Sequence, residues 1–170
     1  MNRKIQLFIA MSLDGYITGP DGDISWLFTD QDYGITKFIE GVDTLIMGRK
    51  SYDAMLALGW MYEGKKIFVY TRRTQNPDGQ NVTFTSLAPE KLMEDIRRQP
   101  GKNIWLFGGG EVVKLFLDAA LVDEMVVAIH PVVLGGGAPL FPQGVSRTNL
   151  GLVRSESFDS GLLIATYLVS

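Results

Sequence analysis

Short apolar runs rich in β-branched residues alternate along this chain with longer amphipathic stretches, and this order restricts the possible folds more than any other feature of the sequence. Helical periodicity is found in residues 30–40, 51–58, 89–99 and 111–120. The apolar runs expected to form strands are residues 4–10, 44–47, 66–70, 82–85, 103–107, 124–133, 152–158 and 162–169. Asp30 and Ser51 are suited to cap the first two helices.

Strands that alternate with helices pair in parallel through right-handed crossovers, so the pattern predicts an α/β fold. We expect three layers, in which a mostly parallel, mixed sheet of eight strands carries four helices divided between its two faces. The last two strands are separated by Asp159-Ser160-Gly161, which indicates a hairpin and an antiparallel edge. With 170 residues and no linker or repeat, the chain is expected to form one domain, residues 1–170.

The composition excludes several classes of function. The chain contains no cysteine and one histidine, which rules out a thiolate metal site, a His cluster for zinc and a cysteine nucleophile, so no metal is expected. Lys and Arg total 16 against 19 acidic residues, and they do not cluster beyond pairs, so nucleic acid is not an expected partner. The first apolar run is too short to span a membrane and shows no signal-peptide pattern, so we expect no membrane partner and a cytoplasmic location.

Open parallel sheets bind ligands beyond the carboxyl ends of their strands, and three turns at such ends carry candidate residues. Gly108, Gly109 and Gly110 separate a buried strand from a helix that begins with Glu111 and Val112. Without Cβ atoms the backbone can approach an anion closely, and the helix N-terminus attracts negative charge. The segment favours phosphate binding, while the plain alternative is a tight turn with unusual dihedral angles.

The other two turns carry positive charge and hydroxyl groups. Gly48-Arg49-Lys50-Ser51 follows one buried strand, and Thr71-Arg72-Arg73 follows the next. Together with the three glycines they could recognise a pyrophosphate and a further phosphate through charge-assisted hydrogen bonds. Taken singly, each arginine is more often a solvated surface charge.

The segment from Ala10 to Leu27 is long for a connection in a compact domain, which is typical of a functional lid. Its alternative is a surface excursion whose Trp26 plugs the edge of the core. Asp14, Asp30 and Asp32 are the carboxylates that could face a pocket and donate a proton to a substrate; acidic residues at such places are as often caps or loop pins. Position slightly favours Asp32 over Asp30 as the proton donor. His130, alone on a strand, is expected to be structural.

The chain resembles the dihydrofolate-reductase-like superfamily, most closely the reductase domain of the bifunctional riboflavin-biosynthesis deaminase-reductase and its stand-alone relatives. The resemblance covers nearly the whole chain, and its most specific element is Pro131-Val132-Val133-Leu134-Gly135-Gly136-Gly137. The other motifs that carry it are Ala10-x-Ser12-x-Asp14-Gly15, Met47-Gly48-Arg49-Lys50-Ser51-Tyr52 and Gly108-Gly109-Gly110-Glu111.

The resemblance implies NADPH bound across the strand ends of a dihydrofolate-reductase-like fold. Gly48, Arg49, Ser51, Thr71 and Arg72 would hold the adenosine phosphates, and Gly108, Gly109 and Gly110 the pyrophosphate. Ala10 and Ile17 would lie near the nicotinamide, the same turns contribute Lys50, Glu111 and Val112 to the cofactor site, and Trp26 and Tyr33 would contact the substrate. Related domains form dimers, and the apolar run at residues 162–169 favours a homodimer here.

These observations predict an NADPH-dependent oxidoreductase that reduces a small-molecule substrate, either a heterocycle of the pteridine or aminopyrimidine type or a carbonyl compound. Two alternatives remain open from the residues alone. One is a nucleotide-binding module without turnover, and the other is a true dihydrofolate reductase. Asp30 and Asp32 do not keep the spacing of the folate-binding carboxylate relative to Trp26, which weighs against the second alternative.

Overall fold

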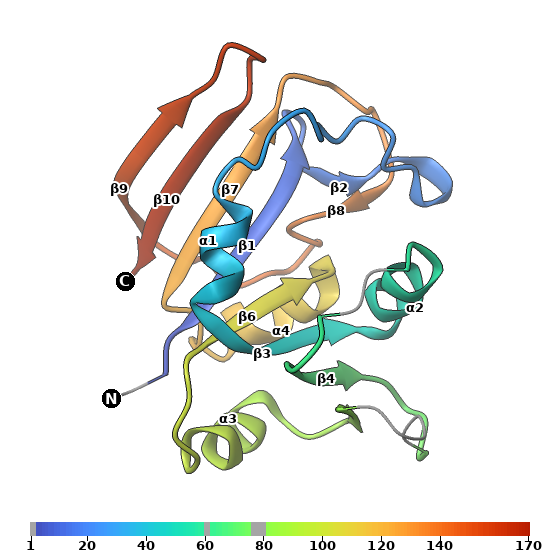
Figure 1. Cartoon of the computed structure of the whole chain (residues 1–170), viewed down its shortest axis with the longest axis vertical. Coiled ribbons are helices and arrows are strands. Elements are labelled where there is room, and N and C mark those ends of the chain that lie inside the picture. The colour runs from blue at the N-terminus through green and yellow to red at the C-terminus, as the bar shows by residue number, and fades with distance from the viewer. Residues whose placement is uncertain (1–2, 60–61, 76–80) are drawn as a thin grey trace.

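The architecture is a mixed sheet of eight strands in the order β5-β4-β3-β6-β1-β7-β10-β9, seen in a computed structural model that describes residues 3–59, 62–75 and 81–170 (Figure 1). Its strands are β1 (Ile5–Ser12), β3 (Val42–Gly48), β4 (Lys66–Tyr70), β5 (Val82–Thr85), β6 (Asn103–Gly108), β7 (Glu124–His130), β9 (Leu150–Ser157) and β10 (Leu163–Val169). The first six strands in this order, from β5 through β7, pair in parallel with their neighbours. Strand β10 runs antiparallel to both of its neighbours, β7 and β9. The predicted α/β fold with an antiparallel C-terminal hairpin is confirmed.

Helices cover both faces of this sheet. They are α1 (Ile35–Glu40), α2 (Arg49–Ala57), α3 (Pro89–Arg97) and α4 (Gly110–Asp118). Buried side chains of α3 and α4 pack with Ile5, Leu7 and Leu106 on one face. On the other face, buried side chains of α2 and partly buried ones of α1 pack with Leu45 and Trp105.

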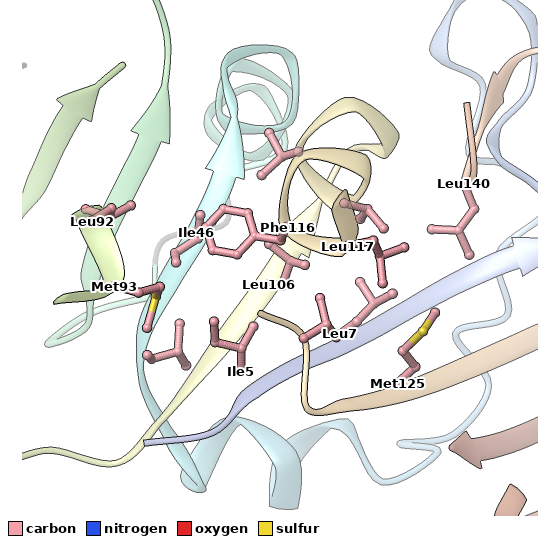
Figure 2. Close-up of a cluster of buried hydrophobic side chains, with 14 of the residues drawn as sticks. Ile5, Leu7, Ile46, Leu92, Met93, Leu106, Phe116, Leu117, Met125 and Leu140 are labelled. Carbon is pink, nitrogen blue, oxygen red and sulfur yellow. The ribbon is translucent and has the colours of Figure 1, made fainter. Parts of the chain in front are cut away.

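Phe116 of α4 lies at the centre of the first core and points toward Ile46 and Leu106 (Figure 2). Its side chain is fully buried, and burial of an aromatic or aliphatic side chain of this size contributes about 1.5–3 kcal/mol. The apolar face of α4 is therefore the contact that fixes the start of this helix against the end of β6.

Several helix and strand boundaries differ from the predicted ones, including the starts of α1 and α2 and the end of β7. Helix α1 begins at Ile35 rather than Asp30, because Tyr33 (φ 51°) and Gly34 (φ 85°) adopt left-handed backbone that interrupts the helix. Helix α2 begins at Arg49 with Gly48 as its extended N-cap, so the prediction that Ser51 caps it is wrong.

The third difference is at β7, which ends at His130 rather than at residue 133 because Pro131 follows. Two further strands were not predicted: β2 (Tyr16–Thr18) and β8 (Ala138–Pro139) form a small antiparallel sheet beside the carboxyl end of β1. Among residues 3–59, 62–75 and 81–170 we find no helix long and apolar enough to cross a membrane.

Candidate functional site

Two helices begin side by side at the carboxyl ends of β3 and β6. Helix α2 starts after Gly48 and helix α4 after Gly109, and neither N-cap residue has a side chain that could cap the helix. A Cβ atom added to Gly48 would lie 3.9 Å from the backbone nitrogen of Gly109, so the two starts are in contact. The first turn of every helix exposes amide N–H groups without intrahelical acceptors, and here two such turns meet.

Small and apolar groups surround this meeting point. A Cβ on Gly109 would be 3.4 Å from Ile17 Cδ1 and 3.6 Å from Ser51 Oγ, and one on Gly108 would be 3.2 Å from Ile9 Cδ1. The buried side chain of Val112 lies 3.2 Å from the Cβ position of Gly48. The structure therefore brings together residues predicted from two separate turns and from the segment after β1.

Gly110 is required for a different reason. A Cβ at this position would collide with the carbonyl oxygen of Pro139 and press on that of Leu140. Because Gly110 has no Cβ, the end of β8 and the residue after it can lie against the first turn of α4. Gly108 and Gly109 are joined by a cis peptide bond, and Gly108 has a φ of 113°.

Arg49, the first residue of α2, lies beside a groove of about 340 Å³. Its Nε donates to Asp53 Oδ1 at 2.8 Å, and its guanidinium carbon lies 5.4 Å from the centre of the Phe84 ring. One terminal nitrogen of the same guanidinium is buried and has no hydrogen-bond partner. Buried polar groups are nearly always paired in folded proteins, so this unpaired nitrogen makes Arg49 a candidate for contact with a group outside the chain.

A second unpaired polar atom lies one strand away. The hydroxyl of Tyr70, the last residue of β4, is buried without a hydrogen-bond partner. Burial, with the carboxylate of Glu90 as a further cause, raises the pKa of Tyr70 to about 12, so the hydroxyl keeps its proton. In the described part of the chain, the buried side-chain polar atoms that lack a partner belong to Arg49 and Tyr70, at the carboxyl ends of adjacent strands.

The other residues that we predicted to bind the cofactor lie around this site. Lys50 and Glu111 are exposed in the first turns of α2 and α4, and Ala10 is half-buried in β1. Thr71 Oγ1 accepts a hydrogen bond from the backbone N–H of Arg73 at 3.2 Å. Arg73 and not Arg72 lines the groove.

Sequence reasoning missed most of the walls of this groove. They comprise Tyr52, Asp53, Leu56, Arg73, Gln75 and Phe84 beside Arg49. The adjacent pair of arginines after β4 was visible in the sequence, but which of the two faces the groove depends on the path of the backbone. Phe84 could be found only from the pairing of β5 with β4.

Asp14 is held as a carboxylate. It accepts hydrogen bonds from Ser12 Oγ (2.6 Å) and from the backbone N–H groups of Leu134 (3.0 Å) and Gly135 (2.8 Å). The hydroxyl of Ser12, followed by the amide of Leu134, lowers the pKa of Asp14 to about 2. Such a group has no proton to donate near neutral pH. The contacts therefore favour a structural role for Asp14, which pins its loop, over a role as the proton donor.

The region before α1 ties its acidic residues to local structure. Asp32 accepts from the hydroxyl and amide of Thr36 and from the amide of Gly34, and the Thr36 hydroxyl is the main cause that lowers the pKa of Asp32. Asp30 does not cap the helix; it accepts a hydrogen bond from the Tyr33 hydroxyl at 2.8 Å. The Tyr33 hydroxyl also lies 2.9 Å from Ser160 Oγ, which connects this segment to the β9–β10 hairpin.

Trp26 contacts the buried side chain of His130 at the end of β7. The two ring centres are 5.0 Å apart in an edge-to-face arrangement, and Phe28 packs against the same imidazole at 4.9 Å. His130 Nε2 accepts from the backbone N–H of Phe28 at 3.2 Å, and burial lowers the pKa of His130. The neutral imidazole thus anchors the predicted lid segment, as expected of a structural histidine. Within the described residues no group of three His, Asp or Glu side chains could hold a metal ion.

Comparisons with known proteins identify the family of the chain. The model of the RibD C-terminal domain family matches residues 60–164. The uncharacterized protein YyaP of Bacillus subtilis (strain 168) is 35% identical over 178 residues, which cover 97% of this chain and 94% of that protein.

Two solved structures share the fold. The chain superposes on a putative riboflavin biosynthesis protein of Shewanella sp. PV-4 with a TM-score of 0.88 at 32% identity, over 98% of this chain and 99% of that one. It also superposes on dihydrofolate reductase of Enterococcus faecalis, complexed with NADP(H) and RAB-propyl, with a TM-score of 0.72 at 17% identity, over 100% of this chain and 98% of that one. The dihydrofolate-reductase-like fold is thereby confirmed.

Proposed function

Because the chain belongs to the RibD C-terminal domain family, a family of reductases, we propose that it binds NADPH and reduces a small heterocyclic or carbonyl-type substrate by hydride transfer. The observation that carries this proposal is the contact between the glycine starts of α2 and α4, where the first turns of two helices meet. A pyrophosphate needs N–H donors and a backbone without Cβ atoms.

The residues present fit the cofactor in two respects. Gly48 and Gly109 form a cradle that a Cβ would narrow, because the Cβ of Gly48 would lie 3.2 Å from Val112 Cγ2. The unpaired nitrogen of Arg49 lacks an acceptor, which a phosphate oxygen would provide. On this assignment Gly108, Gly109 and Gly110 hold the pyrophosphate, and Arg49, Ser51 and Thr71 the adenosine end.

The bound cofactor would supply the hydride, and the chain would supply binding, orientation and exclusion of water. Ala10 lies toward the end of β1, and Ile17 lies in the small β2–β8 sheet; both would border the nicotinamide. The proton for the substrate would come from water, since Asp14 and Asp32 are held in their ionised forms by hydrogen bonds.

That same observation about the carboxylates favours one second candidate, a nucleotide-binding module without turnover. Such a module keeps the glycine turns and needs no acid. The two functions differ in a simple measurement: the module would bind NADPH and leave it unoxidised in the presence of any substrate.

The test has two steps on the full chain. NADPH is first titrated by fluorescence, and its oxidation is then followed against dihydropteridines including dihydrofolate, aminopyrimidines and simple carbonyl compounds. The proposal expects binding and turnover of at least one class. Binding without turnover across the whole panel would favour the module, and absence of NADPH binding would refute both.

A further inference from the structure

The groove beside α2 contains both a cation and an anion that could touch a nucleotide. Its lining includes Arg49 and Arg73 and one acidic residue, Asp53, whose side chain is 52% exposed. Arg49 and Asp53 are one helical turn apart on α2, and the ion pair between them forms part of the wall of the groove.

Asp53 controls one edge of the Arg49 guanidinium. It accepts the Nε–H at 2.8 Å, while the guanidinium carbon lies over the Phe84 ring at 5.4 Å from its centre. A guanidinium has five N–H donors in one plane, and a single carboxylate contact leaves most of them for another acceptor. The buried nitrogen without a partner belongs to this remaining set. Asp53 and Phe84 therefore orient Arg49, and Asp53 also neutralises part of its charge.

The two side chains have opposite preferences for an adenosine ribose. Arginine accommodates the 2′-phosphate of NADP, whereas a carboxylate accepts a hydrogen bond from the free 2′-hydroxyl of NAD. A 2′-phosphate carries a charge of about −1.5 to −2 and is repelled by a nearby carboxylate. The groove thus contains an element for each form of the cofactor.

We propose that Asp53 is a specificity-determining residue, which weakens the preference of this groove for a 2′-phosphorylated adenosine over its unphosphorylated form. The inference rests on the proposed function, because it requires that the groove receive the adenosine end of a dinucleotide. Arg49 supplies the attraction for the phosphate, and Asp53 opposes it while remaining a usable acceptor for a 2′-hydroxyl. The chain accordingly accepts both forms, with a modest preference set by the difference between the two side chains.

The test uses two fragments that lack the nicotinamide, so that it does not depend on turnover. Calorimetry gives the affinities of the full chain for adenosine 2′,5′-bisphosphate and for AMP, which differ only in the 2′-phosphate. We expect Asp53→Asn to raise the ratio of the two affinities by about three- to tenfold, the effect of removing one nearby charge in a solvent-accessible groove. The gain should shrink at high ionic strength.

Asp95→Asn is the matched control, because Asp95 forms a comparable exposed ion pair with Lys91 on α3 and lies outside the groove. It should leave the ratio unchanged, and Arg49→Gln should lower it. Thermal melting of each variant verifies folding. A ratio that stays constant or falls in Asp53→Asn overturns the inference, since Asp53 would then only position Arg49. If neither fragment nor NADPH binds the unmodified chain, the proposed function fails first and the inference with it.

Discussion

Arg3 and Arg49 place guanidinium groups at opposite ends of the parallel strands, and their surroundings differ sharply. Arg3 precedes β1 and is 5% exposed. It donates to the carbonyl oxygens of Lys102 and Ile96, to the carboxylate of Asp43 and to Thr44 Oγ1. Arg49, at the carboxyl end of β3, has one carboxylate partner and one buried nitrogen with none.

The contrast separates a residue that serves folding from one suited to a ligand. A cavity of about 270 Å³ lies beside Arg3, and the charged groups on its walls already have partners: Arg3 as above, Lys66 with Gln99, and Asp95 with Lys91. The groove beside Arg49 has an unmet donor. Since an unsatisfied buried donor costs about 1–3 kcal/mol, it indicates a partner outside the chain more strongly than the size of a cavity does.

The largest expected effect is on stability. Arg3→Leu removes the partner of Asp43 and should lower the free energy of unfolding by about 3 kcal/mol, toward the lower limit for a broken buried pair because Asp43 is one-third exposed. Arg49→Leu removes an unpaired buried donor together with an exposed ion pair, so it should not lower the free energy of unfolding. Urea unfolding of both variants measures the difference. Equal losses would show that the two arginines have the same structural role.

The second expected effect is on cofactor affinity, where substitution of Arg49 should matter. Arg49→Ala should weaken NADPH more than NADH, by about 1.5–3 kcal/mol if a charged hydrogen bond is lost. Arg98→Ala, an exposed arginine on the segment after α3, is the control and should leave both affinities unchanged. Fluorescence titration with each cofactor is sufficient, and equal weakening of NADPH and NADH would contradict the assignment of Arg49.

The two edges of the sheet offer a related comparison. Strand β9 has eight exposed residues, including Leu152 (61%) and Val153 (60%), whereas β5 at the other edge has four residues and two of them are buried. Long exposed edges are usually paired, so we expect a homodimer through β9. Leu152→Lys should weaken dimerisation at least tenfold, or by ~1.4 kcal/mol, and Thr83→Lys on β5 should not. A monomer of the unmodified chain at micromolar concentration in sedimentation would contradict this.

The smallest effect concerns pH. The pKa of Asp14 is lowered from 3.8 to about 2 in the folded chain, so the unfolded state binds the proton more readily. The stabilisation is therefore complete above pH 3.8 and is lost as the pH falls toward 2. Asp14→Asn should flatten the dependence of stability on pH in this window, as measured by unfolding at several pH values. An unchanged slope would show that its hydrogen bonds do not hold the loop.

The fold could be predicted because each central strand is a continuous apolar run bounded by glycine, proline or an amphipathic helix. Runs such as Leu45 to Met47 and Ile104 to Leu106 are buried throughout, as a strand covered on both faces requires. The meeting of Gly48 with Gly109 could also be anticipated, because both follow strands of one parallel sheet.

Details set by single dihedral angles or by distant contacts could not be predicted. Asp30 was predicted to cap α1, but the left-handed backbone at Tyr33 and Gly34 moves the start of the helix to Ile35. The β2–β8 sheet depends on Gly137, where a Cβ would collide with the carbonyl oxygen of Thr18. No periodicity in so short a segment signals that approach.

A crystal structure of the full chain with NADP⁺ would show whether the cofactor binds at the starts of α2 and α4. We expect the pyrophosphate between the first turns of α2 and α4, against Gly48 and Gly109, and the 2′-phosphate on Arg49. A dinucleotide bound elsewhere, with the Arg49 nitrogen still unpaired, would contradict this expectation.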